Sequence, residues 1–150
     1  MQDFFKAEIS CTGSLTLPIA KNSEVFAKAD PVMIDSDGLT VVATATSKVI
    51  GYAMEDFTAA SDNQTVAKKY PKCAPARGQL MVYTSDQACT QTDCGAYADL
   101  AGTTGAITIN LAAGSSGSFI VRGFDPDKDG STTKVVVMAA EVQDDAYAQA

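Results

Sequence analysis

The sequence predicts an all-β protein with only minor helix, built as a small β-sandwich or barrel-like domain with an extended N-terminal arm. The first observation is composition: 24 Ala, 15 Thr and 12 Val stand against 6 Phe and no Trp. Small and β-branched residues suit pleated sheets around a thin core. The second observation is the spacing of turn-forming residues. Clusters of Gly, Ser, Asp and Asn interrupt the chain at roughly the 8–12-residue spacing of all-β folds. A chain of 150 residues is long enough for one domain with its own core.

We expect a single domain in three parts: an arm with the first strands over residues 1–28, a β domain over 29–142, and a flexible tail over 143–150. In the arm, residues 5–11 alternate with period two, which indicates a strand or an extended segment. Pro18 keeps the segment that follows extended and at the edge of a sheet.

The apolar side chains of the arm allow two interpretations. They are either part of the core of this chain, or they bind a neighbouring protein. Under the second interpretation, the candidate contact residues are Phe4, Phe5, Leu15, Leu17 and Ile19.

Residues 29–55 are predicted to form a three-stranded meander around which the rest of the chain is arranged. The pair Asp37-Gly38 is a strong hairpin signal between its first two strands. Gly51, in the middle of the third strand, suggests a bulge or a close backbone approach. The strands expected here span residues 32–34, 39–45 and 49–54.

The remaining strands follow from short β-prone runs. Residues 71–78 contain two prolines and a glycine and are predicted to be loop, and a polar loop with two cysteines is expected over residues 85–95. The segments from 119 and from 134 are expected to pair with each other. The expected strands span residues 64–70, 79–84, 106–111, 119–124 and 134–139.

Charge and residue usage exclude several classes of function. The net charge is −7 with only eleven Lys and Arg, so binding to a nucleic-acid backbone is not expected. No apolar run reaches the length of a membrane span, and the N-terminus does not read as a signal peptide. The chain has no His, which removes the commonest general base and the commonest zinc ligand. We therefore predict no catalytic residues and no enzymatic activity.

The four cysteines leave several interpretations open. Cys89 and Cys94 are close enough in a polar loop for a disulfide or a local pair of free thiols. Cys11 and Cys73 are too scattered to supply the second pair of a thiolate metal site. Burial as small apolar side chains is the remaining alternative.

One acidic loop resembles part of a calcium site. Asp125, Asp127 and Asp129 followed by Gly copy the first half of an EF-hand loop, but the position of the closing Glu is occupied by Val136. We therefore reject an EF-hand and favour a tight hairpin loop, with a looser calcium site as the alternative. Residues 35–38 are interpreted in the same way, as a tight hairpin loop with a calcium site as the alternative. No metal or cofactor is predicted.

The meander resembles the core of the head decoration (cement) proteins of tailed bacteriophages. In that family, a strand of the form Gly/Asp-x-Val is followed about twenty residues later by a strand of the form Ile-Gly-Tyr/Val-Ala. The matching segments here are Asp30-Pro31-Val32 and Ile50-Gly51-Tyr52-Ala53. The resemblance covers about a quarter of the chain, and the cysteine loop and residues 58–78 depart from it.

The resemblance implies a structural virion protein made in the host cytoplasm. Such a protein binds the outer surface of an icosahedral capsid, bridges neighbouring major capsid protein subunits, and is usually a homotrimer. It implies no catalytic residue and no cofactor. The alternative from a different class is a calcium-assisted β module that binds carbohydrate or a cell surface.

Overall fold

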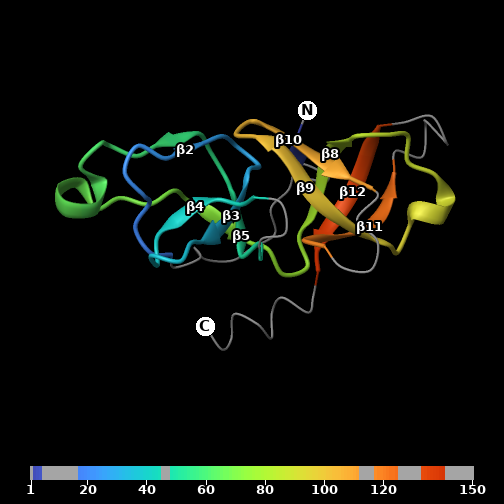
Figure 1. Cartoon of the computed structure of the whole chain (residues 1–150), viewed down its shortest axis with the longest axis horizontal. Helices are drawn as coiled ribbons and strands as arrows, with labels where there is room; N and C mark the ends of the chain where they lie inside the picture. Colours follow the sequence, from blue (N-terminus) through green and yellow to red (C-terminus); the bar gives the residue numbers. More distant parts are fainter. Residues whose placement is uncertain (1, 5–16, 45–47, 112–116, 125–132, 141–150) are drawn as a thin grey trace.

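The computed structural model confirms the all-β class. It describes residues 2–4, 17–44, 48–111, 117–124 and 133–140, and in these ranges it contains twelve strands, one five-residue π-helix and one turn of 3-10 helix. The described chain forms two lobes side by side along its long axis (Figure 1). No helix among these residues is both long and apolar enough to span a bilayer.

One lobe is a closed five-stranded β-barrel. Its strands are β8 (Leu80–Ser85), β9 (Tyr97–Thr103), β10 (Ala106–Asn110), β11 (Phe119–Phe124) and β12 (Lys134–Ala139). The pairings run β8–β10–β9–β11–β12 and return to β8, so the sheet closes on itself. The β8–β10 pair is parallel and the other four pairs are antiparallel. Closure leaves few unpaired strand edges in this lobe.

Alternation along each strand fills the barrel with apolar side chains. In β8 the buried positions alternate with half-buried ones, and β12 begins in the same way. The Tyr83 and Phe119 rings pack inside with centroids 5.8 Å apart. The buried apolar residues of the five strands are Met81, Tyr83, Ala98, Leu100, Ile107, Ile109, Phe119, Val121, Val135, Val137, Met138 and Ala139.

The other lobe, residues 17–76, has shorter strands and is called the small lobe. It contains a four-stranded antiparallel sheet in the order β4 (Thr40–Val42), β3 (Pro31–Ile34), β5 (Gly51–Ala53) and β7 (Cys73–Pro75). A two-stranded ribbon of β2 (Val25–Phe26) and β6 (Phe57–Thr58) lies beside it. The first hairpin, β3–β4, turns at the expected Asp-Gly pair, where Gly38 has a φ of 77°.

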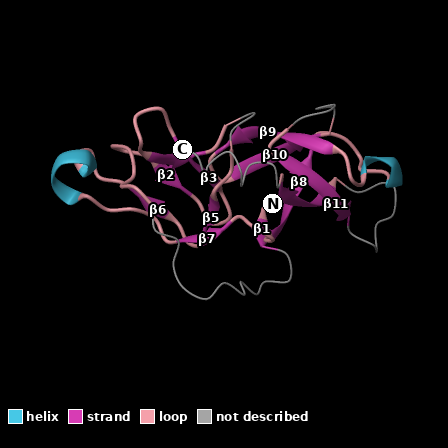
Figure 2. Cartoon of the chain, turned by 90° about the horizontal axis from the view of Figure 1, so that it is seen from below, coloured by secondary structure: helices cyan, strands magenta, loops and turns pink. Residues whose placement is uncertain are grey.

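The N-terminal strand β1 (Asp3–Phe4) lies between the two lobes (Figure 2). It pairs antiparallel with β8, with Phe4 opposite Met81. The Phe4 ring meets Tyr52 of β5 edge-on, with centroids 6.3 Å apart. A single cluster of buried apolar residues therefore runs through both lobes and the strand between them.

The segment around Pro18 lies along an edge strand, as expected. The backbone N–H of Thr40 in β4 donates to Ile19 O (3.0 Å), and the N–H of Lys21 donates to Thr40 O (3.2 Å). The Thr40 hydroxyl donates to Pro18 O (2.8 Å). This part of the arm is thus a partial fifth strand of the small sheet.

Four features of the secondary structure differ from the sequence-based expectations. Residues 64–70 do not form a strand, because residues 63–67 form the π-helix η1 (Asn63–Ala67). The predicted loop over 71–78 contains strand β7, and strand β9 was not predicted at all. The bulge also lies elsewhere: Gly51 pairs regularly with Val32 and Pro75, whereas the register shifts next to Gly123 in β11.

Candidate interaction surface

A buried carboxylate joins three parts of the chain at the junction between the lobes. Asp30 is fully buried, and its Oδ1 accepts hydrogen bonds from Gln2 Nε2 (2.6 Å) and from the backbone N–H of Gly105 (2.9 Å). Its Oδ2 accepts from the backbone N–H of Ala27 (2.9 Å). A buried carboxylate needs such donors, because its loss of hydration is otherwise very costly. Asp30 therefore has a structural role at this junction.

Gln2 extends the same network into the barrel. Its Oε1 accepts the backbone N–H of Ile107 (3.1 Å), and its Nε2 also donates to Lys28 O (2.8 Å). One glutamine side chain thus contacts the β10 backbone, the Asp30 carboxylate and the chain before β3. Nothing in the local sequence around Gln2 or Gly105 predicts this role, because the partners are more than 25 positions away.

Tyr83 makes the second polar link between the lobes. Its hydroxyl, inside the barrel, donates to Ala29 O of the small lobe (2.6 Å). Burial raises the pKa of Tyr83 well above its usual value, and its electrostatic interactions with Tyr52 and Asp30 raise it further. The hydroxyl therefore stays protonated and available as a donor. Together, these contacts make the junction a scaffold rather than an open ligand site.

The candidate contact residues of the arm separate into buried and undescribed positions. Phe4 and Leu17 are buried in the core of this chain, where Phe4 packs on Tyr52 and β8. The structure thus places both side chains in the core of this chain, and their role in binding a partner stays a prediction. Ile19 is half-buried along β4. Phe5 and Leu15 lie outside the described residues.

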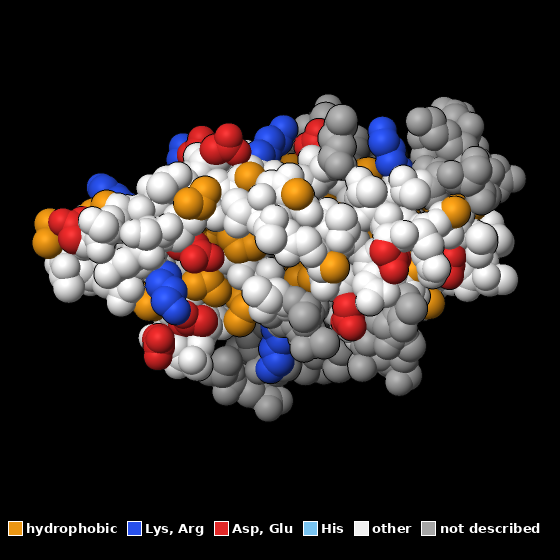
Figure 3. Space-filling view, turned by 45° about the horizontal axis from the view of Figure 1, so that its top comes forward, with side chains coloured by type: hydrophobic (Ala, Val, Ile, Leu, Met, Phe, Trp, Pro, Cys, Tyr) orange, Lys and Arg blue, Asp and Glu red, His pale blue; other side chains and the backbone are white. Residues whose placement is uncertain are grey.

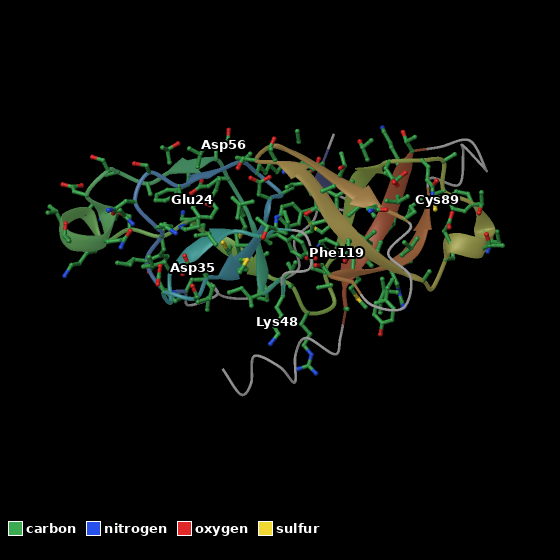
Figure 4. All side chains as sticks on the ribbon, viewed as in Figure 1. Glu24, Asp35, Lys48, Asp56, Cys89 and Phe119 are labelled. Atoms are coloured by element: carbon green, nitrogen blue, oxygen red, sulfur yellow. The ribbon has the colours of Figure 1, made fainter. Side chains whose placement is uncertain are left out.

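Cys89 and Cys94 lie at the end of the barrel far from the small lobe, where Figure 4 labels Cys89. Both are free thiols in the structure, so the disulfide considered from the sequence is not formed in it. Burial raises the pKa of Cys89 to about 11, with smaller contributions from Asp93 and Cys94. Cys73 is also a buried free thiol, and Cys11 lies outside the described residues.

The acidic turn at residues 35–38 is a hairpin cap. The Asp35 carboxylate accepts the backbone N–H groups of Asp37 (2.9 Å) and Leu39 (3.0 Å), and it forms an ion pair with Lys21 (3.4 Å). Burial raises the pKa of Asp35, but these hydrogen bonds and Lys21 outweigh it, so the net pKa is lowered. Within the described ranges, no group of three His, Cys, Asp or Glu residues could hold a metal ion. Asp125, Asp127 and Asp129 lie outside those ranges.

Exposed apolar side chains are concentrated on the small lobe. The large apolar residues that are strongly exposed among those described are Val25 (47%), Ile34 (42%), Val66 (71%) and Tyr70 (53%). All four belong to the small lobe. Apolar atoms reach the surface there between acidic and basic side chains (Figure 3). The small lobe is therefore the better candidate for binding a partner.

The most prominent part of this surface is the 60–70 tip, defined as residues 60–70, which contains η1. Buried Asn63 fixes it: Nδ2 donates to Ala20 O (2.7 Å) and Lys69 O (2.9 Å), while Oδ1 accepts the N–H of Lys69 (2.9 Å). Asn22 and Gln64 exchange a reciprocal pair of hydrogen bonds between side chain and backbone (2.7 and 3.0 Å). The tip is thus held in one shape, largely by side chains whose partners are distant in sequence.

The tip also begins the most basic stretch of an acidic chain. Residues 63–85 contain Lys68, Lys69, Lys72 and Arg77 and no Asp or Glu, whereas the whole chain has a net charge of −7. Lys68 and Lys69 are exposed beside Val66 and Tyr70. Lys68 has a φ of 53°, in the left-handed region, and its N–H closes η1 on Asn63 O. The tip therefore presents a fixed surface that is both basic and apolar.

No protein-family model matches this sequence, and a search of curated proteins found no relative. The described residues define a two-lobed β module whose strongly exposed large apolar side chains lie on the small lobe.

Proposed function

We propose that this chain is a structural virion protein that binds the outer surface of an icosahedral phage capsid and bridges its major capsid subunits. The observation that carries the proposal is the pairing of the two segments that resemble decoration proteins. Asp30-Pro31-Val32 leads into β3 and Ile50-Gly51-Tyr52-Ala53 contains β5, and these strands are neighbours with Pro31 opposite Tyr52 and Val32 opposite Gly51. Segments about twenty positions apart in the sequence thus form one structural unit.

The backbone around that pair is fully engaged, which supports a scaffold role for the shared segments. Ile50 N–H donates to Val32 O (3.0 Å) and Ala53 N–H donates to Asp30 O (2.9 Å). The Asp30 side chain holds the junction with the barrel. The resembling residues therefore build the fold, and binding falls to surfaces outside them.

The exposed surface of the small lobe supports the same proposal. It is spread over a ribbon, a hairpin and a loop rather than gathered in one cavity. A protein that covers a lattice needs such a surface, because many modest contacts add up through avidity. On this proposal the chain acts as a homo-oligomer, with a trimer favoured, on the outside of the virion.

Co-sedimentation with empty capsid shells tests the proposal. Empty expanded shells from the same source as the protein are stripped of other surface proteins and mixed with it. Unexpanded shells are the control. We expect the protein to pellet with expanded shells, in fixed stoichiometry and in the presence of EDTA. Protein that stays in the supernatant would overturn the proposal. Binding abolished by EDTA would support the calcium-assisted module instead.

A further inference from the structure

Two patches of opposite charge lie on the small lobe, each with an exposed apolar side chain. The basic patch belongs to the 60–70 tip and consists of Val66, Lys68, Lys69 and Tyr70. The acidic patch belongs to the β3–β4 hairpin and consists of the exposed residues Ile34 and Asp37.

The two patches are joined through one short segment, residues 19–21. The N–H of Ala20 donates to Lys69 O at the base of the tip (2.9 Å), and Ala20 bridges to Thr40 of β4. Thr40 pairs in turn with Ile34 of β3. Three backbone contacts thus connect Lys69 to Ile34, through Ala20 and Thr40. Both patches therefore belong to one rigid part of the lobe.

The charges of Lys68, Lys69 and Asp37 are not used in ion pairs among the described residues, whereas the neighbouring Asp35 is paired with Lys21. Among the described residues the ion pairs are Lys21–Asp35 and Lys28–Asp3, and neither includes Lys68, Lys69 or Asp37. Both lysines and Asp37 are exposed. The acidic, apolar hairpin of a second copy complements the basic, apolar tip in both charge and apolar character.

We infer that the basic patch of one copy binds the acidic patch of a second copy. In this contact Lys68 and Lys69 lie against Asp37, while Tyr70 and Val66 cover Ile34. A head-to-tail contact of this kind can close into a ring of identical subunits. The contact is small and partly electrostatic, so it weakens as salt increases. It strengthens when copies are held close together, as they would be on a lattice. This contact would join the copies in the homo-oligomer of the proposed function, but it can be tested without a capsid.

A charge-swap experiment on the full chain tests this contact by sedimentation equilibrium over a range of protein concentrations. The variants are Lys69→Glu and Asp37→Lys, studied separately and as an equimolar mixture. Arg122→Glu is the matched control, because it makes the same charge change on an exposed site of the barrel. Thermal melting of each variant checks that it is folded.

We expect the wild-type chain to associate in low salt and each single variant to associate about tenfold or more weakly. The mixture should recover most of the wild-type association, because the new carboxylate at position 69 of one copy then faces the new ammonium group at position 37 of the other. The Arg122→Glu control should change little. A monomeric wild-type chain at every concentration would overturn the inference. So would association that survives both variants, a mixture that fails to recover, or a tip variant that loses shell binding while its mass is unchanged.

Discussion

The hydroxyl of Tyr83 donates a hydrogen bond to the carbonyl oxygen of Ala29 over 2.6 Å, and both residues are fully buried. Tyr83 belongs to the barrel and Ala29 to the small lobe. Ala29 has a φ of 73°, unusual for a residue with a Cβ, and its own N–H donates to Ala53 O (2.7 Å). This backbone is held in place from both sides, so the bond fixes how the two lobes meet.

Replacing Tyr83 by Phe removes that hydroxyl and leaves the carbonyl oxygen of Ala29 buried without this donor. We expect the free energy of unfolding to fall by about 1–3 kcal/mol. Urea denaturation measures the change. Tyr70→Phe is the control, because Tyr70 is 53% exposed, and it should leave the midpoint unchanged. Equal stability of the Tyr83 and Tyr70 variants would show that the bond does not hold the lobes.

Truncation of Phe4 tests whether the start of the arm belongs to the core. Phe4→Ala should cost about 3–5 kcal/mol, because it removes a buried ring that packs on Tyr52. Val66→Ala, at a site that is 71% exposed, should cost almost nothing. The melting temperatures of the two variants give the comparison. A stable Phe4 variant that loses shell binding would show that Phe4 is a contact residue.

We predict that replacing the Asp30 carboxylate by the corresponding amide lowers the stability of the fold. Asp30→Asn keeps the shape, but its amide nitrogen replaces one carboxylate oxygen and cannot accept a hydrogen bond. Either the N–H of Ala27 or the donors of Gln2 and Gly105 then face another donor. We expect a loss of about 2–3 kcal/mol in chemical denaturation. Asp56→Asn is the control, since Asp56 is exposed and accepts a backbone N–H from Lys28. A variant as stable as this control would contradict the role of Asp30 as the junction anchor.

Alkaline pH should destabilise the fold through Cys73. Burial raises the pKa of this thiol from 9.0 to about 12. Between these values the unfolded chain has lost the proton and the folded chain keeps it, so stability falls as pH rises above about 9. The contribution has a limiting slope of about 1.4 kcal/mol per pH unit. Denaturation of wild type and Cys73→Ala from pH 8 to 11 should show a shallower decline in the variant. If the stability of both proteins declines equally as pH rises, Cys73 is not the group responsible.

The barrel strands that could be predicted are those with large β-branched or aromatic side chains at alternate positions. Residues 106–110 and 134–139 have that pattern, and the structure places β10 and β12 there. Strand β9 was missed because its buried side chains are only Ala98 and Leu100, next to exposed Ala101 and Gly102. Such a strand is specified by its neighbours in the barrel rather than by its own sequence.

Long-range contacts explain the other differences between the structure and the sequence-based expectations. Residues 63–67 form a π-helix although Thr65 and Val66 favour strand, because Asn63 bonds to Ala20 and Lys69 and fixes the loop. Strand β7 contains Pro75, which reads as loop locally but is tolerated at the sheet edge where β7 lies. The arm is placed by partners far along the chain, such as Ile107, which lies 105 positions after Gln2, and no local pattern encodes them.

The heat stability of empty capsid shells, measured by scanning calorimetry with and without the bound protein, tests most directly whether this chain stabilises a capsid. Shells are expanded, stripped, and saturated with the wild-type chain. The chain alone and unexpanded shells serve as references. We expect the disassembly transition of the expanded shells to move to higher temperature as the bound protein increases. A transition that stays at the temperature of bare shells, with the protein bound, would contradict this account.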